Sequence, residues 1–363
     1  VEAEKLDDAV RAHVGSEGTQ RPPAAFAAAL RSLPGPVRVD KTSAPLQVAR
    51  ELEAANGPLV WGADPCILPK ACKNPTEIAN TKAAHLTDAA AMCEFLCWFD
   101  AQPPGRISEI DVVTKLEGCR RATNALRDIS FDTIAGTGPN GAVIHYRVTQ
   151  DTNAVLQEGQ LIVVDSGGQY LNGTTDITRT LPVGDVGDEE KSCFTRVLQG
   201  MIGISRLRFP NGLAGRDIDA VARMPLWLAG QDFNHGTGHG VGVYLCVHEG
   251  PQRISRASHV ALKPGMILSN EPGYYREDGF GIRIENLIVV RSAADLDGAD
   301  DRPMLAFDTL TWVPIDRRLI LPEMLSTAER DWIDRYHAAC RDKISPRLSD
   351  AARLWLHQAT APL

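Results

Sequence analysis

Five side chains of the kind that bind metal ions stand in three glycine-containing motifs of this chain. They are Asp165 and Asp176 in DSGGQYLNGTTDITRT, His239 in HGTGHGVG, and Glu271 and Glu285 in NEPGYYREDGFGIRIEN. Four carboxylates and one imidazole form a hard anionic set, which suits two divalent cations such as Mn²⁺ better than thiolate-preferring metals. Two metals that share a water are typical of hydrolases. The fold must therefore bring together segments that lie far apart in the sequence.

The composition is that of a globular protein with a large buried core. The chain has 363 residues, of which 44% are hydrophobic and 23% are charged. The net charge of -8 and the absence of a Lys/Arg run argue against a nucleic-acid partner. No apolar run approaches the roughly 20 residues that span a bilayer, so we expect no membrane partner either.

Eight cysteines without a CxxC motif indicate reduced thiols and a cytoplasmic location. Cys93 and Cys97 lie one helical turn apart among apolar residues, which favours two core thiols over a metal site. The chain begins with VEAEKLDDAV, without a Met and without the basic start and apolar stretch of a secretion signal. We therefore expect a fragment or processed form, and any targeting signal would lie upstream.

Helical patterns occur in three regions of the sequence, at residues 74–126, 189–229 and 327–357. Asn74, Pro75 and Glu77 have the types of an N-cap, a first helical residue and a capping-box partner, and predict a helix over residues 74–100. Small and apolar residues at three- and four-residue steps predict its buried face, at Ala79, Ala83, Leu86, Ala90, Cys93 and Cys97. Further helices are predicted at residues 108–126, 189–208, 216–229 and within 327–357.

Strand patterns alternate with these helices in two similar rounds. The first round contains AVIHY, QLIVVDSGGQY and TTDITRTLPV, and the second contains HGTGHGVGVYL, GMILSNEPGYY and GIRIENLIVV. A short strand is also predicted at residues 58–62. The order of elements predicts an α+β fold.

The spacing of Asp165 and Asp176 limits how their strands connect. A two-residue turn at Asn172 and Gly173 would leave the two acids four positions out of register, roughly 13 Å apart at ~3.3 Å per residue. We therefore predict a longer or bulged connection centred near Tyr170 and Leu171. The same argument applies to the two glutamates that flank GYYREDGFG.

Arg283 and Glu285 alternate with Ile282 and Ile284 in GIRIEN. Alternation on a strand places the charged pair on one face and the isoleucines on the other. Arg283 could then hydrogen-bond a ligand carboxylate and orient it.

The combination VIHY, DSGGQY with TTDITRT, HGTGHGVG with VHEG, NEPGYY and GIRIEN resembles aminopeptidase P, the Xaa-Pro aminopeptidases of the pita-bread (creatinase) superfamily. The resemblance covers roughly residue 74 to the C-terminus. It implies a pita-bread fold with a remnant of an N-terminal creatinase-like domain. The expected parts are a partial N-terminal domain and linker (1–73), a catalytic domain (74–316) and a C-terminal helical extension (317–363). We expect this sequence to lack most of the family's N-terminal region, and a homodimer is a possible assembly.

The resemblance also implies a role for each motif residue. Asp165 ligates one metal, Asp176 and Glu285 bridge both metals, and His239 and Glu271 complete the other site. Glu271 additionally acts as the general base toward the bridging water.

Other motif positions match substrate-site residues of the family. His145, His235 and His248 match three histidines that line this site and can hydrogen-bond the scissile amide or the oxyanion. Tyr275 matches a tyrosine beside the metal-site arginine, which is Arg283 here.

The implied activity is metal-dependent release of the N-terminal residue from peptides with proline in the second position. Such a bond has no amide N–H, so ordinary peptidases that need this donor bind it poorly. Prolidase, which cleaves Xaa-Pro dipeptides, shares the ligand set and is the nearest alternative. A non-catalytic pita-bread binding protein is a third alternative, although every ligand position is filled here. The expected cofactor is two divalent ions, Mn²⁺ first, with Co²⁺ or Zn²⁺ as alternatives.

Overall fold

The computed structural model describes residues 1–16, 18–55, 57 and 59–363. The chain forms two compact units, Val1–Ile67 and Leu68–Leu363. Throughout the described ranges, no helix combines the length and apolar character that a bilayer crossing requires. All eight cysteines are free thiols.

The first unit is small and has few buried residues. Its helices are η1 (Ala3–Lys5), α1 (Asp8–Val14), η2 (Pro23–Ala25), α2 (Phe26–Arg31) and α3 (Leu46–Ala54). Strands β1 (Val37–Val39) and β2 (Leu59–Trp61) pair in parallel, with α3 as the crossover between them. The predicted strand at 58–62 thus exists, although Pro58 lies outside the described residues.

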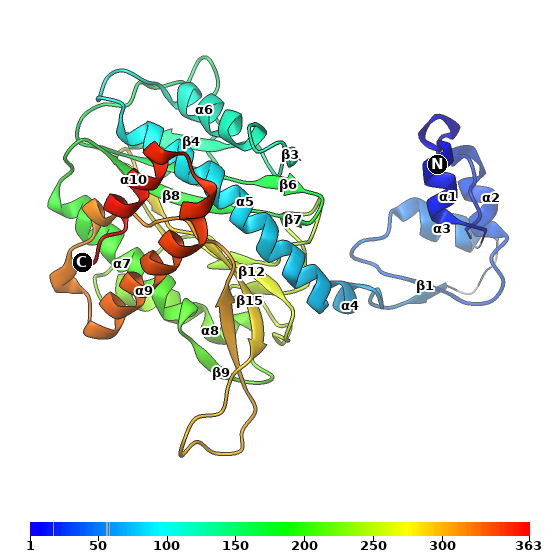
Figure 1. The fold of residues 1–363 in the computed structure, drawn as a ribbon. Helices are drawn as coiled ribbons and strands as arrows, with labels where there is room; N and C mark the ends of the chain where they lie inside the picture. Colours follow the sequence, from blue (N-terminus) through cyan, green and yellow to red (C-terminus); the bar gives the residue numbers. More distant parts are fainter. Residues whose placement is uncertain (17, 56, 58) are drawn as a thin grey trace. The chain divides into compact units, whose positions relative to one another are not determined.

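The helices drawn from light blue to red in Figure 1 belong to the second unit, apart from the first residue of α4. They are α4 (Ile67–Ala71), α5 (Pro75–Asp100), α6 (Glu109–Arg121), α7 (Asp188–Ser205), α8 (Gly215–Trp227), α9 (Thr327–Ile344) and α10 (Asp350–Ala359). Short 3₁₀ segments are η3 (Gly138–Ala142), η4 (Arg317–Leu319), η5 (Pro322–Met324) and η6 (Ser345–Arg347). The predicted cap of α5 is confirmed, because Asn74 and Glu77 form a reciprocal capping box. Helix α6 ends at Arg121 instead of Leu126, where strand β3 begins.

The buried face of α5 agrees in part with the predicted one, because Cys93 is buried and Leu86, Ala90 and Cys97 pack against the core. Ala79 and Ala83 are exposed, whereas the buried face contains the polar residues Thr81, His85 and Asp88. These polar groups are tolerated inside because they find partners there: His85 Nδ1 lies 2.8 Å from the Thr81 carbonyl oxygen, and Asp88 is bonded by several donors. A pattern that counts only apolar residues cannot detect such a face.

The strands of the second unit form several small sheets. Their bounds are β3 (Leu126–Ile129), β4 (Ile134–Thr137), β5 (Gln160–Ser166), β6 (Gly168–Tyr170), β7 (Gly173–Thr174), β8 (Ile177–Val183), β9 (Arg208–Pro210), β10 (Gly238–His239), β11 (Arg253–Ile254), β12 (Ile267–Asn270), β13 (Gly273–Arg276), β14 (Phe280–Arg283), β15 (Asn286–Ser292) and β16 (Met304–Thr309). The sheet orders are β4-β5-β8, β3-β6-β7, β12-β15-β16-β9, β13-β14 and β10-β11.

The AVIHY segment is not a strand, contrary to the sequence pattern. It follows η3 as a turn, in which the Val143 amide donates to Asn140 and the Tyr146 amide donates to Val143. The Tyr146 hydroxyl also donates to the buried carboxylate of Glu109 at 2.9 Å. These local bonds replace a strand ladder.

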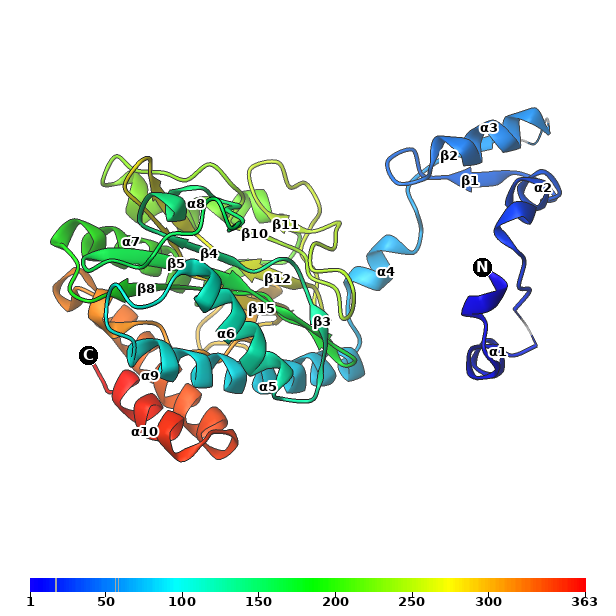
Figure 2. The same ribbon diagram turned by 90° about the horizontal axis from the view of Figure 1, so that it is seen from above.

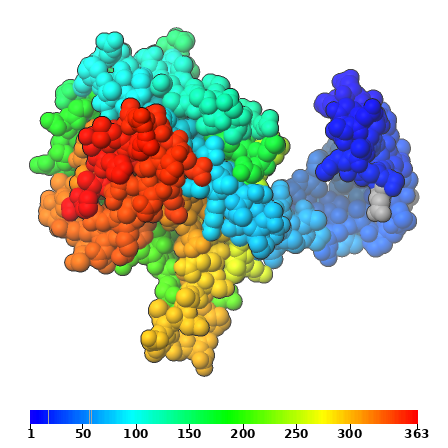
Figure 3. Space-filling view, viewed as in Figure 1, coloured from blue at the N-terminus to red at the C-terminus, as the bar shows by residue number. Residues whose placement is uncertain are grey.

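Helices cover the sheets on the outside. Helices α5 and α6 pack on each other and on strands of the first round, and α7 and α8 pack on each other and on the second round (Figure 2). The C-terminal helices α9 and α10 both contact α5, so the red and orange segment continues the surface of the second unit (Figure 3). The predicted α+β class is confirmed.

The first acid-bearing hairpin has a two-residue turn at Leu171 and Asn172, because Tyr170 pairs with Gly173. The prediction of a longer or bulged connection centred near Tyr170 and Leu171 is therefore wrong, since the pairings on both sides of residue 167 share one register. On the body of the hairpin, Asp165 pairs with Thr178. Asp176 thus lies two positions from the partner of Asp165 and on the same face, because side chains alternate with a period of two. Such diagonal neighbours are about 7–8 Å apart, close enough to face one site.

The second hairpin brings its two glutamates directly opposite each other. Asn270 pairs with Asn286 on one side and Gly273 pairs with Arg283 on the other, so the intervening Glu271 stands across from Glu285. A three-residue connection, residues 277–279, closes this hairpin.

One close approach of the backbone limits substitution in the second hairpin. A Cβ added to Gly281 would lie 1.7 Å from the Gly141 carbonyl oxygen, whereas a Cβ on Gly118, in α6, meets nothing within 4 Å. We expect Gly281→Ala to lower the free energy of unfolding by about 1–3 kcal/mol or more through overpacking. Gly118→Ala, the matched control, should raise it by about 0.5–1 kcal/mol through helix propensity. Urea unfolding of both variants measures this, and equal stabilities would contradict the close approach.

Candidate metal centre

All five predicted metal-type side chains line or border one cavity of the second unit, of about 680 Å³. Asp165, Asp176, His239 and Glu271 line it, together with the three predicted substrate-site histidines, His145, His235 and His248. Glu285 lies beneath the lining and is 1% exposed. The structure therefore gathers every predicted site residue in one place.

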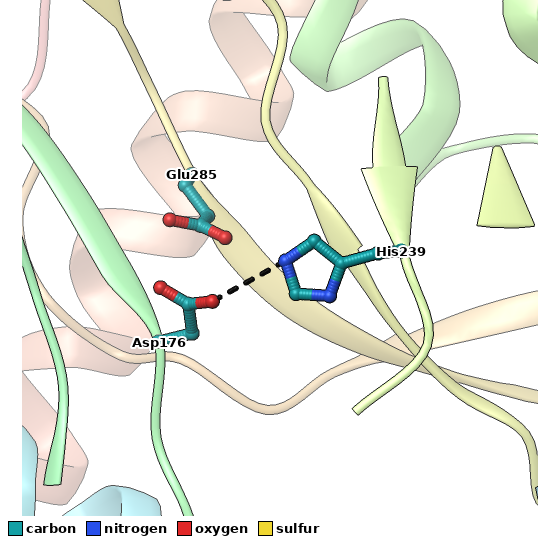
Figure 4. A group of neighbouring side chains, drawn as sticks. All are labelled: Asp176, His239 and Glu285. Carbon is teal, nitrogen blue, oxygen red and sulfur yellow. Dashed lines mark ion pairs between the residues drawn. The ribbon is translucent and has the colours of Figure 1, made fainter. Parts of the chain in front are cut away.

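Three of the side chains converge most tightly. One ligand atom each from Asp176, His239 and Glu285 lies within 4.8 Å of the others. In Figure 4 the two carboxylates approach from neighbouring strands and the imidazole points at them from the other side. His239 Nε2 is 3.4 Å from Asp176 Oδ2 and equally 3.4 Å from Glu271 Oε1.

The imidazole of His239 has the orientation of a metal ligand. Its Nδ1 lies 3.0 Å from the Gly240 carbonyl oxygen, which can only accept, so Nδ1 carries the hydrogen. Nε2 then points at the carboxylates, and its lone pair would become available to a cation that displaces the proton there. A carbonyl that fixes the tautomer through the other ring nitrogen is the usual support of a ligating histidine.

Arg283 contacts the carboxylate on the first hairpin. Its Nη2 donates to Asp165 Oδ2 at 2.6 Å, and its Nη1 donates to the Tyr275 hydroxyl at 2.7 Å. The predicted alternation of this strand is confirmed, because Ile282 and Ile284 are both fully buried in a hydrophobic cluster. Arg283 therefore joins the two hairpins through a charged hydrogen bond.

Two buried carboxylate oxygens of the site lack hydrogen-bond partners among the described residues. They are Asp165 Oδ1 and Glu285 Oε1. A buried acceptor without a partner is costly, and the cost is larger for an ionised oxygen. Oxygen donors of this kind suit hard divalent cations, so the residues fit the cofactor that their types predict.

The titration behaviour of the site reflects burial first and the crowding of like charges second. Burial, reinforced by the charge of Asp176, raises the pKa of Glu285, and burial raises the pKa of Glu271 to about 7. Burial lowers the pKa of His239, but its hydrogen bond to Asp176 and the charge of Glu271 outweigh this and raise the pKa to about 9. In the absence of a cation, protons would compensate the buried negative charge; a bound cation would replace them.

Two hydroxyl residues that the sequence analysis missed orient the glutamates. Thr178 Oγ1 donates to Glu285 Oε2 at 2.8 Å, and Ser269 Oγ donates to Glu271 Oε1 at 3.0 Å. Thr178 stands two positions after Asp176, and Ser269 stands two positions before Glu271, so each hydroxyl shares the face of a site acid at the end of its strand. That spacing was the available signal.

His235 is engaged by the protein through both ring nitrogens. Nδ1 lies 2.8 Å from the Gly236 carbonyl oxygen, and Nε2 lies 2.9 Å from the Tyr275 hydroxyl. Burial and the charge of Arg283 lower its pKa to about 4, so the ring is neutral near pH 7. Hydrogen bonds therefore run from Arg283 to Tyr275 and on to His235.

The other two histidines leave more of their rings free. His248 packs edge-on against His239, with ring centroids 4.2 Å apart, and is exposed. Its loop is held by an ion pair between the neighbouring Glu249 and the buried Lys73. His145 is exposed at the cavity wall.

The remaining cavity wall combines apolar and charged side chains. Phe131, Ile134 and Ile144 form its apolar part. Arg147 and Asp132 also line the cavity and form an ion pair at 2.5 Å. The cavity can thus hold an apolar ring beside a polar, charged centre.

Comparisons with known proteins agree with this geometry. Residues 79–292 match the model of metallopeptidase family M24, and residues 303–363 match the C-terminal region of peptidase M24. The chain is 42% identical over 324 residues to aminopeptidase P1 of Lotus japonicus, covering 82% of this chain and 49% of that protein. The chain spans about half the length of such curated relatives.

Solved structures give the same result for the fold. The X-prolyl aminopeptidase of Caenorhabditis elegans, described as a cytosolic enzyme with a dinuclear active site, superposes with a TM-score of 0.91 at 31% identity, over 100% of this chain and 61% of that chain. The Xaa-Pro dipeptidase of Bacillus anthracis superposes with a TM-score of 0.65 at 27% identity, over 78% of this chain and 74% of that chain. The fold is thus the pita-bread fold of the aminopeptidase P and prolidase group, and the chain belongs to metallopeptidase family M24.

Proposed function

We propose that this chain is the catalytic part of a metal-dependent aminopeptidase that releases the N-terminal residue from peptides with proline in the second position. The observation that carries the proposal is the convergence of Asp176, His239 and Glu285 beside Asp165 and Glu271. The similarity to aminopeptidase P and X-prolyl aminopeptidase supports the substrate class.

In this proposal the five side chains hold two divalent cations, Mn²⁺ first. Asp165 would hold one ion, His239 and Glu271 would hold the other, and Asp176 and Glu285 would contribute to both. The unpartnered Asp165 Oδ1 and Glu285 Oε1 support this arrangement. When bound, such a pair of ions lowers the pKa of a shared water and polarises a carbonyl group.

Glu271 is the proposed general base. Burial raises its pKa to about 7 without a cation, and Ser269 holds its Oε1 while the carboxyl group faces the cavity. Burial and a bound cation act on this pKa in opposite directions, and the carboxylate would accept a proton from water and return it to the leaving amine.

The histidines contribute differently. His248 and His145 reach the cavity with free ring atoms and are the proposed donors to the scissile group. Both nitrogens of His235 are already bonded, so we propose that it positions Tyr275 and, through it, Arg283.

The boundaries of the protein's parts remain proposals. Residues 1–73 would be a partial N-terminal creatinase-like domain and linker, which is supported by the division of the compact units after Ile67. Residues 74–316 would be the catalytic domain and 317–363 its helical extension. The C. elegans neighbour is described as cytosolic, and we propose a cytoplasmic location for this protein as well.

Removing one proposed ligand should abolish metal binding. Glu285→Gln keeps the shape of the side chain but removes its charge, so we expect loss of bound Mn²⁺ and a fall in activity of at least about 100-fold. Elemental analysis and turnover of the same samples measure both quantities. Glu323→Gln, at an exposed site, is the matched control and should behave as the wild type. Full metal occupancy in Glu285→Gln would contradict the ligand assignment.

Product analysis separates the proposed activity from that of a prolidase. On the tripeptide Arg-Pro-Pro with Mn²⁺, we expect release of free arginine and the dipeptide Pro-Pro, detected by chromatography. Activity confined to the dipeptide Arg-Pro would favour the prolidase alternative. Metal binding without turnover of either peptide would favour a binding protein.

His248 should act on the reaction without holding metal. We expect His248→Ala to lower kcat/KM by about 100-fold, the usual effect of removing one transition-state donor, with bound Mn²⁺ unchanged. His357→Ala, on the exposed side of α10, is the control. If His248→Ala instead loses metal and activity in parallel, the residue supports the centre and does not contact substrate.

A further inference from the structure

A fully buried ion pair lies behind the first acid-bearing hairpin and has no part in the proposed reaction. Asp88 on α5 and Arg120 on α6 are both 0% exposed. Arg120 Nε donates to Asp88 Oδ1 at 2.7 Å, and its Nη2 donates to Asp88 Oδ2 at 3.1 Å. This two-bond geometry is the strong form of an ion pair and fixes both side chains.

The pair holds the hairpin at several points. Asp88 accepts from the Tyr170 hydroxyl at 2.6 Å and from Thr175 Oγ1 at 3.0 Å. Arg120 Nη2 also donates to the Ser166 carbonyl oxygen at 3.3 Å. Ser166 follows Asp165 in the sequence and Thr175 precedes Asp176. The pair therefore bonds the immediate neighbour of each hairpin acid.

One of these bonds, at Thr175, falls where the hairpin's own ladder is interrupted, whereas Ser166 and Tyr170 lie within β5 and β6. Residue 167 and residues 175–176 lie outside the strands, between the β5–β8 ladder and the β6–β7 ladder. Asp176 thus lacks the ladder bonds that normally fix a strand residue. Adjacent side chains of an extended segment point to opposite sides, so holding Thr175 toward the helices turns Asp176 toward the cavity.

We propose that Asp88 and Arg120 are positioning residues that set the direction of Asp165 and Asp176 and so determine the metal affinity of the centre. The inference rests on the proposed function, because it concerns the same metal centre. It assigns the two helices a role in the site beyond packing.

A buried pair of opposite charges is better explained by a positioning role than by a contribution to stability alone. Two charges buried together gain little over an apolar pair of the same volume. Arg120 Nη1 is also buried without a partner in the described structure, which an arrangement serving stability alone would avoid. What the pair adds is direction, since its acceptors and donors are aimed at three separate points of the hairpin.

The test weakens the link without removing either charge. Thr175→Val keeps the side-chain shape and deletes the hydroxyl that contacts Asp88; Tyr170→Phe deletes the other hydroxyl. Thr195→Val, at a buried threonine of α7 whose hydroxyl bonds Lys191 and Leu319, is the matched control. Mn²⁺ is titrated by calorimetry into the chelator-treated full chain of each variant, with thermal unfolding of the metal-free forms in parallel.

We expect the dissociation constant for Mn²⁺ to rise about 10-fold in Thr175→Val and in Tyr170→Phe, and to stay unchanged in Thr195→Val. Equal affinities in all folded variants, with only the unfolding temperature lowered, would overturn the inference and leave a structural role. If the wild type itself binds no Mn²⁺, the proposed metal centre fails first, and the inference fails with it.

Discussion

The crowding of four carboxylates in one cavity is the constraint on which this structure depends. Asp176 and Glu285 are nearly fully buried, and their neighbours Asp165 and Glu271 add like charges. Arg283 compensates one of them through a direct bond to Asp165. The remaining charge must be met by protons or cations, because an uncompensated carboxylate inside a protein is very costly.

The two hairpins bring their acidic side chains together in different ways. The first uses a diagonal offset between Asp165 and Asp176, and the second places Glu271 directly across from Glu285. Hydrogen bonds then join the hairpins: the Glu285 amide donates to the Thr178 carbonyl oxygen, and the Thr178 hydroxyl donates to the Glu285 carboxylate. The acids therefore meet because of strand register, and a shift by one residue would turn each of them away from the cavity.

Much of the site could be predicted from sequence, because its residues stand in short motifs with fixed alternation. The capping box at Asn74 and the burial of Ile282 beside Arg283 follow from the same local rules. The turn of the first hairpin could not be predicted. Its two residues, Leu171 and Asn172, do not form one of the residue pairs that mark a two-residue turn. The polar part of the buried face of α5 was missed, because Asp88 is buried together with partners that are distant in the sequence.

The C-terminal region is coupled to the centre by the same kind of buried bond. Arg179, fully buried on β8, donates to the Glu285 carbonyl oxygen at 2.6 Å and to the Val313 carbonyl oxygen at 2.6 Å. It also donates at 3.1 Å to the hydroxyl of Tyr336 on α9, whose ring stacks on Trp332. One guanidinium therefore fixes the backbone of a proposed ligand and the C-terminal helix together. Losing that helix would leave several buried donors and acceptors unpaired beside Glu285, so the region is physically part of the metal centre's support.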